Sequence, residues 1–235
     1  MPSAILTWHS LDRTGRLYST PPDVFRMQVE ALLEGGLRFV SLDQVTTADG
    51  SVALTFDDGH CNFLDTALPI LLEYKIPSTL FVVSGRCGGD KNWPSCQPFS
   101  TKDDELLSWD QLRQAASAGV AIGAHSVHHP NLVTLSESDA ARELRDSRLE
   151  IEDRLGRPVP WFAYPYGHSN PRLRALAARE FKLACGVDLS LARKDSDPFD
   201  LPRIFEFYLR HPFWLRHLTA PLGRTYLAAR RLKSA

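Results

Sequence analysis

Short apolar runs alternate with longer amphipathic stretches along most of the chain. The apolar runs are rich in strand-forming residues and end at a polar residue or a glycine, whereas the stretches between them repeat apolar positions with a helical period. The predicted strands cover residues 5–8, 37–41, 52–56, 78–83, 120–124, 161–164, 181–185 and 201–205, and the predicted helices cover 20–34, 63–74, 108–119, 136–155 and 171–179. Regular alternation of this kind predicts parallel strands joined by crossover helices, which is the α/β class.

Three helix starts carry capping signals. Thr20 precedes two prolines, Ser108 and Gln111 have the spacing of a capping box, and Ser136 opens the longest helix. No stretch within residues 1–205 resembles a linker, so we predict a single domain there, followed by a basic, aromatic helical extension over residues 206–235.

Composition narrows the possible function classes. A chain of 235 residues that is 43% hydrophobic can bury one full core, and a net charge of −1 argues against a general nucleic-acid binder. From Leu201 to the end there are seven Lys and Arg residues and one Glu, so the tail alone is strongly basic. A terminal helix packed on the domain is the simpler interpretation of this tail, and peripheral contact with an anionic membrane is the second.

The chain shows no signal peptide and no apolar run long enough to span a bilayer. We therefore expect a cytoplasmic protein, with the inner face of the membrane as the place where the tail would act. Cys61 and Cys185 follow or end apolar runs and are expected to be buried thiols. Cys87 and Cys96 flank one segment of the polar loop 86–104, and the sequence leaves open whether they pair. Because long loops in small domains are often functional, we expect this loop to shape the substrate groove.

Reactive side chains recur at the carboxyl ends of the predicted strands. His9, Asp57 with Asp58, His125, Tyr166 and Arg203 all stand at or just after such an end. The strand pattern alone fits an open sheet or a barrel. A β/α barrel would bring these ends to one mouth, where chemistry takes place, and this favours the barrel.

Two of these strand ends together suggest a metal site. Adjacent carboxylates at Asp57 and Asp58 repel each other unless a cation or a shared proton lies between them. His125 and His129 are four residues apart, so one helical turn would place both imidazoles on the same side, with His128 pointing elsewhere. A solvated turn or a polar loop would explain either motif alone, but their combination favours a metal.

The ligand set predicted from the residues is Asp58, His125 and His129. Two imidazoles and one carboxylate with an open fourth position are typical of catalytic zinc, and the same set suits iron, cobalt or nickel. A bound metal lowers the pKa of water to about 7, which corresponds to roughly 12 kcal/mol relative to free water. The neighbouring Asp57 would then serve as the base that takes the water's proton.

These residues resemble the motifs of the NodB-homology polysaccharide deacetylases, carbohydrate esterase family 4. Residues 55–59 (TFDDG) and 125–130 (HSVHHP) resemble its first two motifs, in the right order and at a normal separation. Residues 164–167 (YPYG) resemble the third motif, and residues 201–204 (LPRI) resemble the closing strand of one branch. The resemblance spans about residues 5–205. It implies a deformed (β/α)7 TIM-like barrel and metal-dependent hydrolysis of N-acetyl groups from amino sugars of a polysaccharide or glycolipid.

The resemblance also implies roles for individual residues. Asp57 corresponds to the general base, the three predicted ligands correspond to the family's metal site, and the backbone N–H of Tyr166 would help bind the oxyanion. Many members carry an arginine where this chain has Ala163, and we predict that Arg203 orients Asp57 instead; a rim charge is the alternative.

A second departure concerns the general acid. Many members close with a histidine, which residues 201–204 lack, whereas the branch acting on exopolysaccharides such as poly-N-acetylglucosamine has a histidine at the end of its first strand. His9 has that position, and we predict that it protonates the leaving amine. A histidine satisfied within a loop is the alternative.

Two other functions remain compatible with the sequence. An enzyme of the same fold could deformylate a lipid-linked amino sugar or open a cyclic amide. A carbohydrate-binding pseudoenzyme is less consistent with a complete set of ligands and base.

Overall fold

The strands form one curved parallel sheet in the order β7–β6–β5–β4–β3–β1–β8, and β2 pairs with β3 beside this path. The computed structural model describes residues 2–16, 18–93 and 105–234. The strands are β1 (Ala4–Trp8), β2 (Arg38–Phe39), β3 (Ser51–Phe56), β4 (Ser78–Val82), β5 (Ala121–Ala124), β6 (Trp161–Ala163), β7 (Leu183–Cys185) and β8 (Ile204–Phe205). Every pairing between them is parallel, as the alternation of strand and helix predicted.

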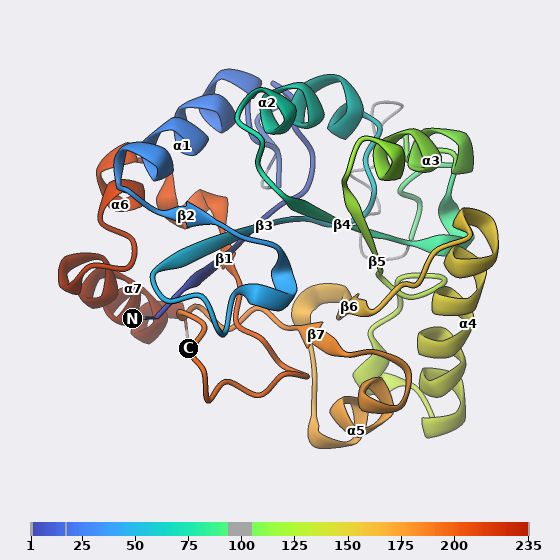
Figure 1. The fold of residues 1–235 in the computed structure, drawn as a ribbon. Coiled ribbons are helices and arrows are strands. Elements are labelled where there is room, and N and C mark those ends of the chain that lie inside the picture. The colour runs from blue at the N-terminus through green and yellow to red at the C-terminus, as the bar shows by residue number, and fades with distance from the viewer. Residues whose placement is uncertain (1, 17, 94–104, 235) are drawn as a thin grey trace.

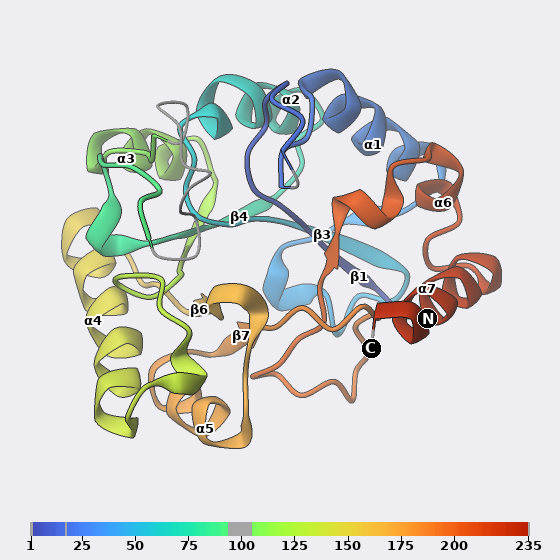
Figure 2. The same ribbon diagram turned by 180° about the vertical axis from the view of Figure 1, so that it is seen from behind.

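Helices surround this sheet on its outer side (Figures 1 and 2). They are α1 (Pro22–Glu34), α2 (Leu68–Glu73), α3 (Trp109–Ser117), α4 (Glu137–Leu155), α5 (Pro171–Glu180), α6 (Pro212–Arg216) and α7 (Pro221–Ser234). A parallel bridge between Cys185 and Leu201 connects β7 to the segment that leads into β8, which lies next to β1. The sheet therefore curls round most of a circle, and the predicted deformed (β/α)7 barrel is confirmed.

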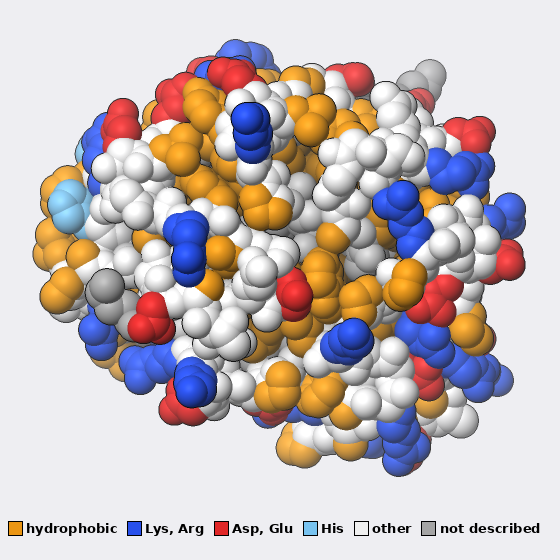
Figure 3. Space-filling model, viewed as in Figure 1, with side chains coloured by type: hydrophobic (Ala, Val, Ile, Leu, Met, Phe, Trp, Pro, Cys, Tyr) orange, Lys and Arg blue, Asp and Glu red, His pale blue; other side chains and the backbone are white. Residues whose placement is uncertain are grey.

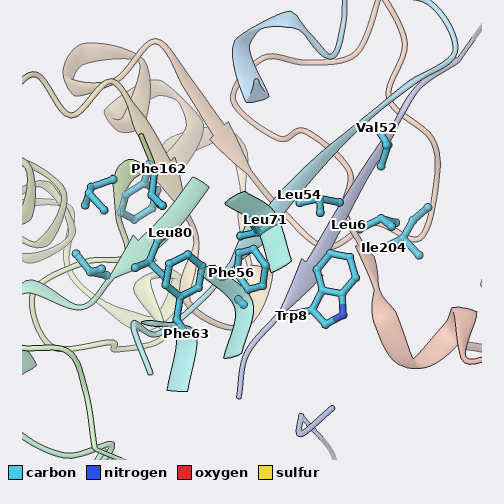
Figure 4. Packing of buried hydrophobic residues seen from close by; sticks show 14 of the residues in the cluster. Leu6, Trp8, Val52, Leu54, Phe56, Phe63, Leu71, Leu80, Phe162 and Ile204 are labelled. Carbon is cyan, nitrogen blue, oxygen red and sulfur yellow. The ribbon is translucent and has the colours of Figure 1, made fainter. Parts of the chain in front are cut away.

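Alternate side chains of the strands pack into two clusters. Leu6, Trp8, Leu54 and Phe56 point toward the helices and are almost fully buried there, as Figure 4 shows. Their neighbours, among them Ile5, belong to a second cluster on the other side of the sheet. Strands buried on both faces read as continuous apolar runs, which is why the sequence pattern located them so readily.

Some local predictions were wrong. Thr20 does not cap α1, because Pro21 holds the cap position without a side-chain bond, and the Thr20 hydroxyl donates to Glu206 instead. The helix predicted over 63–74 begins as a π-helical segment, Phe63–Ala67, before α2. The caps at Ser108 and Ser136 are confirmed. Thr20 was misassigned because its partner lies far away in the sequence.

The C-terminal residues pack on the barrel as α6 and α7. Gly35 at the end of α1 lies so close to α6 that an added Cβ would stand 2.7 Å from the carbonyl oxygen of Arg216. Leu215, Leu218 and Leu227 of this segment are buried. The packed-helix interpretation of the tail is therefore confirmed, while the domain division at residue 205 stays a prediction. Among the described residues, we find no helix with the length and apolar character needed to cross a bilayer.

Candidate functional site

Asp58, His125 and His129 meet at the carboxyl ends of β3 and β5. Oδ1 of Asp58 lies 3.6 Å from Nε2 of His125 and 3.5 Å from Nε2 of His129. One potential ligand atom from each residue falls within 4.8 Å of the others, and all three side chains are buried. The structure thus brings together the three residues that the sequence predicted as ligands.

The backbone conformation at the site sets the directions of the ligand side chains. Of the five non-glycine residues described with positive φ, four are at this site: Asp58 (71°), Ser126 (64°), His129 (58°) and Tyr166 (60°). Residues other than glycine rarely adopt this region, and such strain tends to concentrate at functional sites. The prediction of a helical turn from His125 to His129 is wrong, because two of these left-handed residues bend the chain instead.

Side chains hold this bend in place. The backbone N–H of His129 donates to Oγ of Ser126 at 2.9 Å. Glu143 of α4 accepts the backbone N–H groups of Val127 and His128, at 2.9 and 3.0 Å, and its other oxygen lies 2.7 Å from Nδ1 of His128. His128 points away from the ligand cluster, as predicted. The roles of Ser126 and Glu143 were not visible in the sequence, because an isolated Ser and a helical Glu carry no distinctive spacing.

The three donor groups fit a divalent metal. Nδ1 of His125 lies 2.7 Å from the carbonyl oxygen of Ala163, which can only accept, so Nδ1 is the donor in this contact and Nε2 is the ring nitrogen left to face Asp58. Burial, with His125 nearby, lowers the pKa of His129 to about 3, so its imidazole is neutral at pH 7. Two imidazole nitrogens and one carboxylate are donors that zinc binds.

Asp57 is held by Arg203 beside this cluster. The guanidinium donates two parallel hydrogen bonds to the two carboxylate oxygens, at 2.7 and 2.8 Å, and its Nε donates to the carbonyl of Gly186 at 3.0 Å. Both side chains are buried. Burial alone would raise the pKa of Asp57, but Arg203 together with His125 and His9 outweighs it, so that pKa lies below its ordinary value. The structure therefore places Arg203 on Asp57 and not at the rim.

The second carboxylate oxygen of Asp58 lies beside two basic side chains, Lys91 and His60, which the sequence did not predict. Nζ of Lys91 lies 2.6 Å from Oδ2, and Nε2 of His60 lies 3.6 Å from it. Burial raises the pKa of Asp58, but the ammonium of Lys91 and the hydrogen bond with His60 hold it well below its usual range. Trp93 is buried and stacks on the His129 ring at 4.3 Å between centroids. Lys91 and Trp93 belong to the loop that was expected to be functional, but its composition gave no indication of which residues face inward.

His9 lies at the end of β1 between Tyr18 and Phe205, with ring centroids 4.9 and 5.6 Å away. Burial lowers the pKa of His9 to about 4, although the carboxylates of Asp58 and Asp57 oppose this shift. Its Nδ1 has no hydrogen-bond partner among the described residues. The interpretation of His9 as a histidine satisfied by its loop is therefore not supported by its contacts.

Tyr166 lies on the other side of the cluster. Its ring centroid is 4.7 Å from that of His129, and its hydroxyl donates to the backbone oxygen of His129 at 3.2 Å. The next residue, Gly167, has φ of 70°, and a Cβ there would overlap the side chain of Val187. Only glycine therefore allows the chain to hold Tyr166 in this position.

The cysteine predictions have mixed outcomes. Cys185 is buried and Cys61 is partly buried, and neither forms a disulfide. Cys96 and most of the loop 86–104 lie outside the described residues, so the pairing with Cys87 stays open.

Comparison with known proteins gives a consistent result. Residues 44–183, more than half of the chain, match the family described as "Polysaccharide deacetylase". The chain is 22% identical over 209 residues to "Putative polysaccharide deacetylase YxkH" of Bacillus subtilis, covering 85% of this chain and 70% of that protein. It is 24% identical over 204 residues to the "Poly-beta-1,6-N-acetyl-D-glucosamine N-deacetylase" of Staphylococcus aureus, covering 80% of this chain and 67% of that one.

Solved structures agree on the fold. IcaB from Ammonifex degensii superposes with a TM-score of 0.75 at 22% identity, covering 92% of this chain and 98% of that one. The deacetylase PplD of Streptococcus pyogenes, solved with acetate, superposes with a TM-score of 0.73 at 24% identity, covering 87% of this chain and 92% of that one. From the family match, the motifs and the fold, we conclude that this chain belongs to the polysaccharide deacetylase family of NodB-homology (carbohydrate esterase family 4) hydrolases.

Proposed function

We propose that this protein is a metal-dependent N-deacetylase that removes acetyl groups from N-acetylated amino sugars of a polysaccharide or glycolipid. The observation that carries the proposal is the buried cluster of Asp58, His125 and His129 beside an aspartate that Arg203 keeps ionised. Zinc is the metal that we propose, because two imidazole nitrogens and one carboxylate form a set that catalytic zinc takes.

Each residue has a distinct task in this proposal. Asp58, His125 and His129 would hold the metal, which when bound polarises the amide carbonyl and acidifies water. Asp57, ionised and oriented by Arg203, accepts the proton of the attacking water. The backbone N–H of Tyr166 donates to the oxyanion that develops on the amide oxygen. Acetate and the free amine are the products once the amine has gained a proton.

His9 is the proposed donor of that last proton. Because its pKa is lowered to about 4, the imidazole is neutral at pH 7 and can serve as an acid only after receiving a proton during the reaction. His9→Ala tests this step. The proposal expects kcat to fall by at least about a hundredfold with unchanged metal content. Unchanged turnover would instead assign the return of the proton to Asp57.

The proposed substrate class rests on similarity to the Staphylococcus aureus enzyme, whose name specifies poly-β-1,6-N-acetylglucosamine. The test is acetate release from β-1,6-linked N-acetylglucosamine oligomers by zinc-loaded protein, with metal content measured on the same sample. Asp58→Asn should lose both metal and activity, whereas Asp57→Asn should keep the metal and lose activity. Asp65→Asn, an exposed acid nearby in the sequence, is the matched control.

Particular outcomes would overturn the proposal. Undiminished acetate release by Asp58→Asn would exclude this metal site. Formate release from an N-formyl analogue, without acetate release, would identify a deformylase. A wild-type protein that binds no divalent metal and releases neither acid would be a carbohydrate-binding pseudoenzyme. The expected cytoplasmic location is likewise a proposal, which cell fractionation would test.

A further inference from the structure

A groove with a volume of about 480 Å³ lies between α7 and the segment that joins β7 to β8. Apolar side chains from both sides line it. Leu189 and Leu227 are buried, Leu191 is partly buried, and Leu232 is 84% exposed. An exposed leucine beside a hollow that is already apolar favours a ligand with an apolar part.

Three arginines line the same groove. Arg224 and Arg231 are seven residues apart on α7 and so lie on one side of the helix, and Arg193 faces them from the other segment. Arg231 pairs with Asp188 at 2.9 Å. Among the residues that the structure describes, no carboxylate pairs with Arg193 or Arg224. Two guanidinium groups are therefore available to an anion from outside the chain.

The rest of helix α7, next to the groove, also combines basic and apolar side chains. Helix α7 carries four basic residues and no acidic one, and it also exposes Leu222. In Figure 3, Lys and Arg side chains lie beside apolar ones at the lower left, where Figure 1 shows α7. A soluble anion would use the arginines but leave the leucines in water. An anionic amphiphile would satisfy both groups at once.

We propose that this groove binds an anionic phospholipid of a bilayer, and that α7 thereby holds the protein at a membrane surface. The headgroup phosphate would lie between Arg193 and Arg224, since guanidinium groups bind phosphate through paired hydrogen bonds. The first part of an acyl chain would lie along the leucines. This inference is independent of the proposed deacetylase activity and adds a membrane partner to it.

The experiment is flotation of the intact chain with vesicles of phosphatidylcholine alone and of phosphatidylcholine containing one third phosphatidylglycerol. We expect binding to the anionic vesicles only. Each basic side chain near an anionic surface contributes about fivefold to the binding constant, so Arg193→Gln/Arg224→Gln should weaken binding by about 25-fold. Leu232→Ser should also weaken it, because the apolar contact is lost.

Matched controls come from α4, on another side of the barrel. Arg142→Gln/Arg145→Gln removes the same charge from exposed positions, and Leu149→Ser removes a leucine that is 46% exposed. Both controls should bind vesicles nearly as the wild type does. Circular dichroism and acetate release from soluble oligomers would show that each variant is folded, and neither readout depends on vesicle binding.

Four results would overturn the inference. They are equal binding to both vesicle types, wild-type binding by the groove variant, an equal loss in the α4 charge control, and displacement of the protein from vesicles by inorganic phosphate at a concentration that leaves ionic strength unchanged. The last result would identify a site for a free anion and not for a bilayer.

Discussion

Replacing Arg203 by Met tests how strongly the site depends on one buried ion pair. The guanidinium is 1% exposed and the carboxylate of Asp57 4% exposed, and two short hydrogen bonds join them. Removing one partner of such a pair leaves an uncompensated buried charge, at a cost of about 3–5 kcal/mol. The carbonyl of Gly186 would also lose its donor. Because small domains are stable by about 5–15 kcal/mol, this one change removes a large share of the total.

The assay is urea unfolding of the chelator-treated protein, which separates the ion pair from metal binding. We expect Arg203→Met to lower the free energy of unfolding by about 3–5 kcal/mol. Adding Asp57→Asn to that variant should recover part of the loss, because the unpaired charge is then gone. Arg203→Lys is the conservative control, since it keeps the charge but loses the second hydrogen bond.

Two results would refute this reasoning. One is an Arg203→Met protein within about 1 kcal/mol of the wild type, which would mean that the pair is solvated. The other is a double variant that is less stable than Arg203→Met by the full cost of Asp57→Asn, since additive effects exclude direct coupling. If Arg203→Met does not fold, Arg203→Lys replaces it, and adding Asp57→Asn should then lower stability further, because it leaves the lysine ammonium buried without a partner.

Three further predictions concern groups around the site and the tail. Burial raises the pKa of Glu206 from 4.5 to about 7, so the folded chain binds a proton there that the unfolded chain has released. The free energy of unfolding should therefore fall by roughly 3 kcal/mol as the pH rises from 4.5 to about 7. Urea unfolding at several pH values should show a weaker dependence of stability on pH in Glu206→Gln, and an unchanged dependence would contradict this. Gly167→Ala should destabilise the protein more than Gly156→Ala in thermal unfolding, because both glycines have positive φ but only the first would meet the Val187 side chain; equal losses would show that Val187 gives way. Lys91→Met should bind zinc more tightly in competition with a chelator, because a cation 2.6 Å from Oδ2 of Asp58 is removed; weaker binding would show that the ammonium acts mainly by positioning the carboxylate.

The parts of the fold that depend on short-range patterns were predictable. Apolar runs located the strands, and the capping residues Ser108 and Ser136 located two helix starts, because these signals depend on neighbouring residues only. Thr20 has an equally good local pattern, but its hydroxyl is used by Glu206, which is 186 residues away. The prediction failed there because a tertiary contact outweighed a local one.

At the candidate site, too, the features set by local sequence were predictable and those set by tertiary contacts were not. Asp58, His125 and His129 were found because each follows a strand, and parallel strands place their carboxyl ends together. The bend between the histidines was not found, since it depends on Ser126 and on Glu143 from another helix. The contact of Lys91 with Asp58 was not predicted for a different reason. One lysine in a polar loop has no spacing that marks it, and only the folded chain shows that its ammonium reaches Asp58.

The left-handed residues explain why this site can be formed before any metal arrives. Each such conformation costs about 1–3 kcal/mol, and the chain holds four of them within three motifs. That cost is tolerated where surrounding contacts leave no alternative: Ser126 accepts from His129, Glu143 holds the two residues between them, and Tyr166 bonds to the carbonyl of His129. The backbone that carries the two histidines is thus held by hydrogen bonds within the protein and not by a ligand. A site arranged in this way loses little conformational entropy on binding a cation, which favours tight binding even though Lys91 already neutralises part of the charge of Asp58.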